Sequence, residues 1–182
     1  MGPKVHVVQY PVRGGEWLNV VCLTEGELQG VSLQDSQDWN LFKTLQDTRA
    51  DLQSALKNTC PHLQALVEAC SNWRLWPLCD RPPMQSAAQH AQGRIALVGD
   101  AAHPMRPYLA QGAGMAIEDA QVLAQSLCTG GASVPEQLNS YAQACWARNA
   151  RVQARAIRNG RIFHAQGAVA LGRNLSMRLM GE

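Results

Sequence analysis

The stretch "RIALVGDAAHPMRPYLAQGAGMAIEDA" runs from Arg94 to Ala120 and combines three structural signals. Its first six residues, Arg94–Gly99, form a short apolar run of the kind found in a buried parallel strand. A glycine-rich segment later enters a helical pattern that extends from about Gly112 to Leu127. The apolar stripe of that helix is expected to contain Ala113, Ala116, Ile117, Ala120, Leu123, Ala124 and Leu127. Strand, loop and helix in this order predict an α/β junction that carries a site.

Asp100 follows the expected strand directly, at the carboxyl end where ligands of α/β sheets usually bind. Its carboxylate can accept two hydrogen bonds from a ribose diol. The helix that begins near Gly112 offers unpaired backbone amides and a partial positive charge, which suit an anion. The alternative is a tight junction in which Asp100 only caps a turn. The segment "GAGMAI" is no dinucleotide fingerprint, because it lacks the third glycine and does not directly follow a strand.

The composition predicts a globular protein. Of its 182 residues, 46% are hydrophobic, and the net charge of +2 gives no indication of nucleic acid or an anionic membrane as a partner. The six cysteines form no C-x-x-C pair and no zinc-type spacing with histidine, so no metal site is expected. The sequence contains neither an apolar signal segment nor a run of about 20 apolar residues. These features favour a cytoplasmic protein with reduced thiols, although the even cysteine count is compatible with disulfides.

Residues 1–80 have the pattern of an antiparallel layer. Val5–Tyr10 and Glu16–Leu23 are rich in β-formers and flank a short glycine-containing turn, which predicts a hairpin. Helices are expected over Trp39–Asn58 and, more briefly, over His62–Cys70. Trp73–Leu78 has the composition of another strand, so the sheet is expected to extend to about residue 78.

A connector rich in proline and glutamine, residues 79–93, separates this layer from the rest of the chain. Ser133 and Glu136 form a capping-box pattern that begins a long helix, expected to reach Asn159 with Gly160 as its stop. The arginines at helical spacing on it are Arg148, Arg151, Arg155, Arg158 and Arg161. They form either a solvated face or a basic stripe that steers an anionic substrate or NAD(P)H.

Taken as a whole, the stretch resembles the C-terminal flavin motif of the single-component FAD-dependent aromatic hydroxylases. This family includes para-hydroxybenzoate, salicylate, 3-hydroxybenzoate and hydroxynicotinate hydroxylases. The matching run is "GRIALVGDAAHPMRPYLAQGAGMAIEDA", residues 93–120. The similarity extends backwards through "HVVQYPVRGGEWLNVV" and "WPLCDRPPM", and forwards through "YAQACWARNARVQARAIRNGRIFHAQG". The resemblance therefore covers nearly the entire chain.

The resemblance implies cofactor roles for residues of this motif. Asp100 matches the aspartate that binds the ribose of FAD, and Pro107 matches a proline packed near the reactive carbon of the flavin ring. The four residues of the following turn match those whose amides lie at the pyrimidine end of the flavin: Gly112, Ala113, Gly114 and Met115. Reduced flavin is anionic, so its charge would lie at a helix N-terminus. His103 is expected to hold the loop by hydrogen bonds rather than to transfer protons.

Substrate roles fall on the first strand, in which His6, Val8 and Tyr10 share a face. In similar hydroxybenzoate and hydroxynicotinate hydroxylases, a histidine and a tyrosine at this spacing face the ring substrate. His6 would accept the phenolic proton, Tyr10 would orient the oxygen, and Pro107 would complete the catalytic set. The alternative is a strand with two amphipathic side chains at a domain seam. Related enzymes carry a polar residue where Pro107 stands, which leaves the identity of the aromatic acid open.

The family begins with a Rossmann unit whose glycine-rich turn holds the FAD pyrophosphate, and these residues contain no counterpart of it. We therefore expect an α/β (α+β) C-terminal portion. Residues 1–80 would contribute part of a substrate-binding domain, and residues 81–182 the last strand and long helices of the FAD-binding domain. The implied activity is hydroxylation of an aromatic acid with FAD, NAD(P)H and O2. The alternative is an inactive module that acts by dimerisation or by association with the missing N-terminal half.

Overall fold

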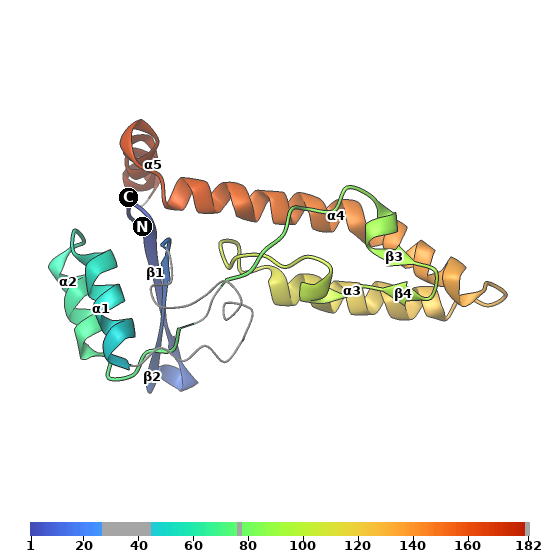
Figure 1. Ribbon diagram of the computed structural model, residues 1–182, viewed down its shortest axis with the longest axis horizontal. Coiled ribbons are helices and arrows are strands. Elements are labelled where there is room, and N and C mark those ends of the chain that lie inside the picture. Colours follow the sequence, from blue (N-terminus) through green and yellow to red (C-terminus); the bar gives the residue numbers. More distant parts are fainter. Residues whose placement is uncertain (27–44, 76–77, 181–182) are drawn as a thin grey trace. The chain divides into compact units, whose positions relative to one another are not determined.

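The computed structural model describes residues 1–26, 45–75 and 78–180 of the chain (Figure 1). The chain divides into two compact units. The first unit comprises Met1–Pro77 together with Arg161–Glu182, and the second comprises Leu78–Gly160. Helices are combined with two small antiparallel sheets, which confirms the predicted fold class.

A β-hairpin forms the sheet of the first unit. Strands β1 (Val5–Val12) and β2 (Trp17–Thr24) pair antiparallel, as predicted, and the short 3-10 turn η1 (Arg13–Gly15) joins them. Gly14 and Gly15 have φ angles of 68° and 99°, which explains why the tight connection uses glycine. The strands continue past the predicted boundary at Tyr10, because β1 runs on to Val12 before the chain turns.

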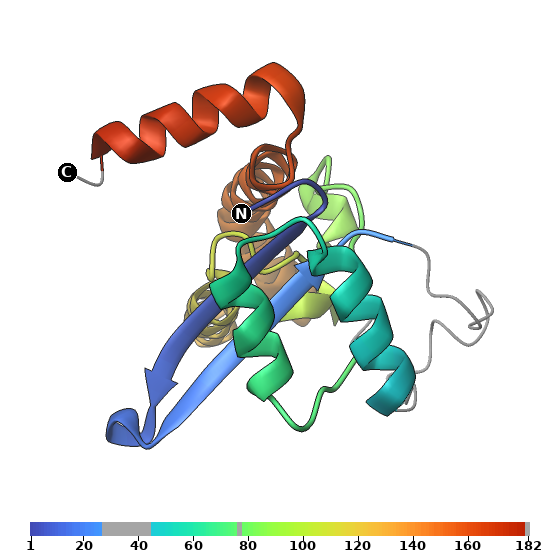
Figure 2. The ribbon, with the colours of Figure 1, turned by 90° about the vertical axis from the view of Figure 1, so that its left-hand side faces the viewer.

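Helices α1 (Leu45–Leu56) and α2 (Pro61–Ala69) cover one face of this hairpin (Figure 2). The core between them contains the buried Val5, Leu52, Leu56 and Val67. Partly buried side chains extend this core: Val7, Cys22, Leu63 and Trp73. Both helices were predicted, although residues 39–44 of the first prediction lie outside the described residues.

The predicted strand at Trp73–Leu78 is wrong for its described part, because residues 73–75 and Leu78 have no strand geometry. Trp73 instead packs its side chain against the core of the hairpin. Residues 76 and 77 lie outside the described residues. Within the described part of the first unit, the sheet therefore consists of β1 and β2.

The second unit begins with two very short strands, β3 (Ala91–Gln92) and β4 (Ile95–Ala96), after the 3-10 turn η3 (Ala87–Gln89). The expectation of a buried parallel strand over Arg94–Gly99 is wrong for this chain. β4 pairs antiparallel with β3, and the side chain of Ile95 is 72% exposed. A buried parallel strand needs hydrogen-bonded neighbours and covering layers, and in the described residues β4 pairs with β3 alone.

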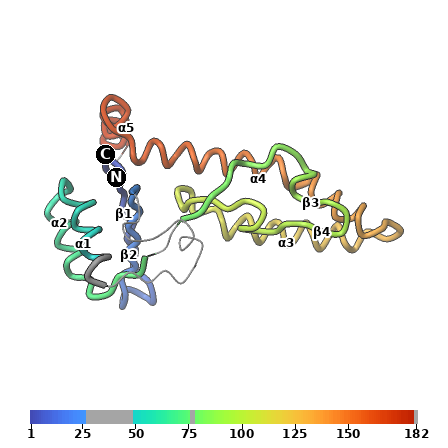
Figure 3. Tube along the Cα trace, viewed as in Figure 1, coloured from blue at the N-terminus to red at the C-terminus, as the bar shows by residue number. Residues whose placement is uncertain are grey.

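Past β4 the chain passes through the 3-10 turn η4 (Gly99–Ala101) into α3 (Gly112–Leu127), a path that can be followed in Figure 3. The bounds of α3 agree with the prediction. Its predicted apolar stripe does not face the core, because Ile117 is 70% exposed. Met115 and Asp119 are its buried residues. Hydrophobic periodicity missed this orientation because a hydrogen-bonded carboxylate, and not an aliphatic side chain, occupies the centre of the buried face.

Helix α4 (Val134–Phe163) begins at the predicted capping box. The backbone N–H and the hydroxyl of Ser133 donate to Glu136 Oε2 over 2.8 and 2.7 Å. Its predicted end at Asn159 is wrong, because Gly160 is helical and α4 continues to Phe163. Gly160 serves packing instead: a Cβ atom on it would lie 2.5 Å from Cε2 of Tyr108.

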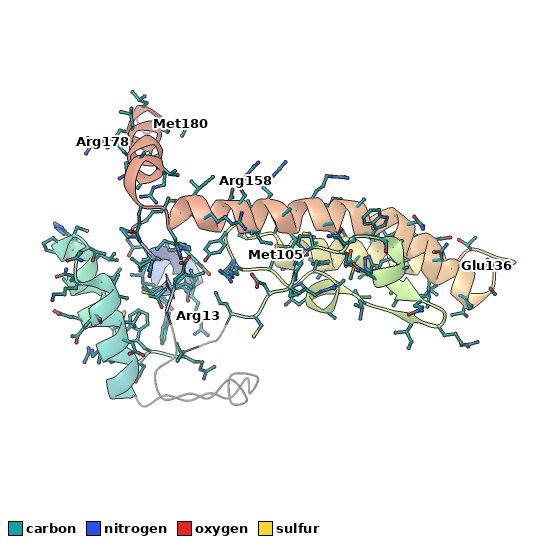
Figure 4. All side chains as sticks on the ribbon, turned by 45° about the horizontal axis from the view of Figure 1, so that its top comes forward. Arg13, Met105, Glu136, Arg158, Arg178 and Met180 are labelled. Atoms are coloured by element: carbon teal, nitrogen blue, oxygen red, sulfur yellow. The ribbon has the colours of Figure 1, made fainter. Side chains whose placement is uncertain are left out.

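Arginines line the outer side of α4 as the sequence predicts. The side chains of all five are exposed, and Figure 4 shows Arg158 among them. Arg148 forms an ion pair with Glu118 of α3 at the surface. This exposure agrees with the interpretation of a solvated face.

The last helix, α5 (Gly167–Met180), belongs to the first unit and has no buried residue. Its exposed apolar side chains are Val169, Leu171, Leu175, Met177, Leu179 and Met180. Among the described residues, no helix has the length and apolarity needed to cross a bilayer.

The contact between Gly160 and Tyr108 leads to a testable prediction. We expect Gly160→Ala to destabilise the protein by about 1–3 kcal/mol, because the new methyl group must displace a buried ring. Gly114→Ala is the matched control in the same unit, since a Cβ there meets nothing within 4 Å, and it should be neutral or stabilising. Urea unfolding followed by circular dichroism measures both. Equal changes for the two variants would contradict the packing role of Gly160.

Candidate functional site

The turn at Gly99 requires glycine for two reasons. Its φ angle of 59° lies in the left-handed region. A Cβ atom on Gly99 would also lie 3.2 Å from Cβ of Ala116, so the backbone of the turn approaches α3 closely. The carbonyl oxygen of Gly99 accepts hydrogen bonds from the N–H groups of Ala102 and His103, at 2.8 and 2.9 Å. The Gly-Asp pair of the motif is therefore held against the first half of α3.

The carboxylate of Asp119 joins this turn to both helices. Its Oδ2 accepts hydrogen bonds from the backbone N–H of Gly99 at 3.1 Å and from Nε2 of His103 at 2.8 Å. Its Oδ1 accepts a hydrogen bond from Nδ2 of Asn149 on α4 at 2.9 Å. The side chains of Asp119, His103 and Asn149 are all buried. His103 thus holds the loop through a hydrogen bond, in agreement with the role expected for it.

The pKa of Asp119 shows that these donors outweigh the effect of burial. Burial alone raises the pKa of a carboxyl group, because it disfavours the charged form. The hydrogen bonds from Asn149, His103 and Gly99 act in the opposite direction and bring the pKa of Asp119 below its usual value. Asp119 is therefore a charged, fully hydrogen-bonded carboxylate inside the protein. Sequence reasoning missed it, because its only signal was an acidic residue among the alanines of a helical stripe.

Asp100 carries a second carboxylate, which is exposed to solvent, whereas that of Asp119 is buried. Asp100 lies in η4 with an exposed side chain. A Cβ atom on Gly112 would lie 3.9 Å from Oδ1 of Asp100, so the structure brings this carboxylate to the first residue of α3. The predicted ribose-binding residue and the predicted glycine-rich turn therefore meet at one place.

The first turn of α3 provides the backbone donors of this place. The N-cap residue Gln111 makes no side-chain capping hydrogen bond. The first backbone amides of an α-helix have no partner within the helix. In α3 these are the amides of Gly112, Ala113 and Gly114. The N–H of Met115 already donates to the carbonyl oxygen of Gln111 at 2.9 Å, and its side chain is buried. Met115 is thus part of the core, whereas the three residues before it are exposed or half-buried.

Side-chain contacts from α4 and from the segment around Asp80 hold the loop between η4 and α3. Nε2 of Gln153 on α4 donates to the carbonyl oxygens of Pro104 and Arg81, at 2.8 and 2.7 Å. Arg106 forms a 2.8 Å ion pair with Asp80. Pro107 of this loop is exposed. The loop can be found in Figure 4 by the label of Met105, two residues before Pro107. The loop thus keeps a defined backbone while it exposes the residue expected beside the flavin.

The residues expected to bind substrate lie on the hairpin of the first unit. His6 pairs with Leu23 and Tyr10 with Asn19 across the hairpin. Because side chains alternate along a strand, His6 and Tyr10 share one face, as predicted. The opposite face carries Val5 and packs against α1 and α2. Tyr10 is half exposed, whereas His6 is buried.

His6 takes part in a hydrogen-bonded chain that sequence reasoning did not find. Its Nδ1 lies 2.8 Å from Nε2 of His164, and Nδ1 of His164 lies 2.6 Å from Oε1 of Glu25. Burial, followed by the charge of His164 and that of the amino terminus, lowers the pKa of His6 to about 4. His164 lies 158 residues from His6, so no local pattern linked the two.

The structure does not collect all the predicted site residues in one unit. His6 and Tyr10 belong to the first unit, while Asp100, Pro107 and the turn that begins at Gly112 belong to the second. Among the described residues, no group of three histidine, cysteine or acidic side chains is arranged to hold a metal ion.

Residues 37–156 match a known protein family, described as the FAD binding domain. This chain belongs to that family. The 3-hydroxybenzoate 6-hydroxylase of Polaromonas naphthalenivorans (strain CJ2) is 35% identical over 174 residues, which are 96% of this chain and 40% of that protein. The 6-hydroxynicotinate 3-monooxygenase of Bordetella bronchiseptica is 41% identical over 98 residues, 53% of this chain and 25% of its own length.

Two solved structures share the fold of this chain. A salicylate hydroxylase substrate complex superposes with a TM-score of 0.75 at 24% identity, covering 98% of this chain and 44% of that one. The R204Q variant of Klebsiella pneumoniae HpxO, complexed with FAD, gives a TM-score of 0.72 at 24% identity, with coverage of 100% and 44%. The chain spans 40% to 50% of the length of the 3-hydroxybenzoate hydroxylases it matches.

The three hydrogen bonds to the buried Asp119 carboxylate lead to a testable expectation for stability. We expect Asp119→Ala to lower the free energy of unfolding by about 3–5 kcal/mol, because three buried donors lose their common acceptor. Glu118→Ala is the matched control, since its carboxylate is 51% exposed and pairs at the surface with Arg148, so stability should hardly change. Chemical denaturation of both variants tests this. Similar losses for the two would show that Asp119 does not organise the unit.

Proposed function

We propose that this chain supplies part of the active site of a FAD-dependent monooxygenase that hydroxylates an aromatic acid of the salicylate, hydroxybenzoate or hydroxynicotinate type. NAD(P)H would donate the electrons and O2 the oxygen atom. The observation that carries the proposal is the exposed Asp100 carboxylate beside the N-terminus of α3. The relatives that match 96% of the chain are hydroxylases of such acids, which supports the assignment of substrate class.

The residues of the second unit have the chemistry that FAD requires. The Asp100 carboxylate can accept hydrogen bonds from the ribose hydroxyls, and the amides of Gly112, Ala113 and Gly114 suit an anionic flavin ring. A Cβ atom on Gly114 would meet nothing within 4 Å, so there is open space for a flat ligand against this backbone. When bound, FAD would supply the redox chemistry, and the protein would position it. We propose Pro107 as the residue beside the ring and Met115 as the buried support of the turn.

On the substrate side, we propose that His6 accepts the proton of the aromatic hydroxyl and that Tyr10 orients its oxygen. The shared face of the hairpin and the half-exposed phenol of Tyr10 support these roles. In this assignment residues 1–80 form part of a substrate-binding domain and residues 81–182 part of the FAD-binding domain. The proposal includes a location in the cytoplasm, because the cysteine pattern fits reduced thiols.

Binding of FAD tests the cofactor assignment directly. We expect Asp100→Ala to weaken FAD binding about tenfold or more, because hydrogen bonds to a charged group contribute about 1.5–3 kcal/mol. Glu68→Ala is the control, an exposed carboxylate on α2 that should leave binding unchanged. Quenching of flavin fluorescence measures the dissociation constants. Equal affinities for the two variants would refute the role of Asp100, and no binding by any form would refute FAD binding by this chain alone.

A second candidate function is association without catalysis, which the exposed apolar side chains of α5 favour. An apolar surface of this kind commonly marks an interface. In that case the chain forms a dimer or binds the N-terminal half of a monooxygenase.

Light scattering distinguishes this second function. We expect the unaltered chain to self-associate as its concentration rises, and we expect the double variant Leu171→Glu/Leu175→Glu to shift it towards the monomer. The control is Arg158→Glu on the solvated face of α4, which should leave association unchanged. A chain that stays monomeric at high concentration would contradict the association hypothesis.

A further inference from the structure

Three segments that are distant in sequence bring two histidines and a carboxylate together at one end of the hairpin. His6 lies in β1, Glu25 directly after β2, and His164 directly after α4. The two imidazole rings are 4% and 6% exposed, and Glu25 reaches solvent with 43% of its side chain exposed. Of these three residues, the proposed substrate site uses His6 alone. The remaining two residues form a path from the buried His6 to the surface.

The chemistry of the three groups fixes where the protons lie. A carboxylate only accepts hydrogen bonds, so Nδ1 of His164 must carry the proton in its 2.6 Å contact with Glu25. Nε2 of a neutral His164 is then an acceptor, and the 2.8 Å contact requires a proton on Nδ1 of His6. A neutral His6 in this arrangement has an unprotonated Nε2. The network thus selects the tautomer whose Nε2 is a base.

We propose that Glu25 and His164 are positioning residues that form a proton relay behind His6. The proposal rests on the function proposed above, in which His6 faces an aromatic hydroxyl. As the hydroxyl gives its proton to Nε2 of His6, the Nδ1–H bond of His6 breaks and that proton bonds to Nε2 of His164. The products are a phenolate, a neutral His6 protonated at Nε2, and a His164 imidazolium beside the Glu25 carboxylate.

The electrostatics of the cluster favour this end state over a charged His6. Burial, followed by the charge of His164 and that of the amino terminus, disfavours a positive charge on His6 and lowers its pKa to about 4. His164 has the Glu25 carboxylate at hydrogen-bond distance, so a proton placed there forms an ion pair. A base with such a low pKa would be a poor final acceptor by itself. With the relay, the proton leaves His6 and is stabilised next to an anion.

Nitrogen-detected NMR of the histidine side chains in the intact chain tests the relay without requiring catalysis. In the neutral state at high pH we expect both His6 and His164 to be protonated at Nδ1. When the cluster takes up a proton on acidification, the hydrogen bond between the two rings reverses, and His6 should switch to the form protonated at Nε2. The exposed His62 on α2 serves as the internal reference. A His6 already protonated at Nε2 at high pH would overturn the proposal.

Two variants and a control sharpen this test. In His164→Gln the amide oxygen can still accept from Nδ1 of His6 but cannot take its proton, so the tautomer should persist and the switch should disappear. In Glu25→Gln the switch should move to lower pH, because the proton taken up by the cluster loses the carboxylate beside it. Glu16→Gln, an exposed glutamate of the same hairpin, should leave it unchanged. A switch that survives His164→Gln would overturn the relay.

Addition of 3-hydroxybenzoate separates the relay from the proposed function. We expect this probe to shift the Nε2 resonance of His6 and to leave that of His62 unchanged. If the switch occurs as described but 3-hydroxybenzoate leaves His6 unchanged, the substrate role of His6 is refuted and the proton relay stands. If the probe shifts His6 but no coupled switch is observed, the relay is refuted and the substrate role stands.

Discussion

The buried carboxylate of Asp119 is the interaction on which the second unit depends. It lies on α3 and receives hydrogen bonds from the turn at Gly99, from His103 in the following loop and from Asn149 on α4. A charge inside a protein is tolerated only when donors surround it, and here each donor comes from a different segment. Satisfying one carboxylate therefore fixes the turn, the loop and both helices relative to one another.

Two aspartates of the same motif acquire opposite roles from their surroundings. Both carboxylate oxygens of Asp119 accept hydrogen bonds from within the protein, and these bonds bring its pKa below the usual value despite burial. Asp100 follows Gly99 within the same turn and keeps an exposed carboxylate beside Gly112. The buried residue builds the site and the exposed one is available to a ligand. Neither role follows from the residue type, since the two carboxylates differ in their burial and in the donors around them.

The sequence predicted the features that depend on near neighbours in the chain. The bounds of α3, the hairpin, and the Ser133–Glu136 cap are all local patterns. The predictions failed where distant segments decide the outcome. Gly160 lies inside α4 and packs against the ring of Tyr108, and the buried face of α3 carries the Asp119 carboxylate in place of the predicted aliphatic stripe. Likewise, His164 contacts His6 across 158 residues, and no local periodicity contains that information.

The backbone of Lys4 connects the main-chain segments that carry the histidine cluster. Lys4 has a φ angle of 58°, a left-handed conformation that costs a residue with a side chain about 1–2 kcal/mol. Its carbonyl oxygen accepts from the N–H of Glu25 at 2.8 Å, and its N–H donates to the carbonyl oxygen of His164 at 3.4 Å. One strained residue thus binds the main chain of the other two members of the cluster, Glu25 and His164. Strain of this kind persists only where surrounding contacts compensate for it, and here they place an acid and an imidazole in line behind His6.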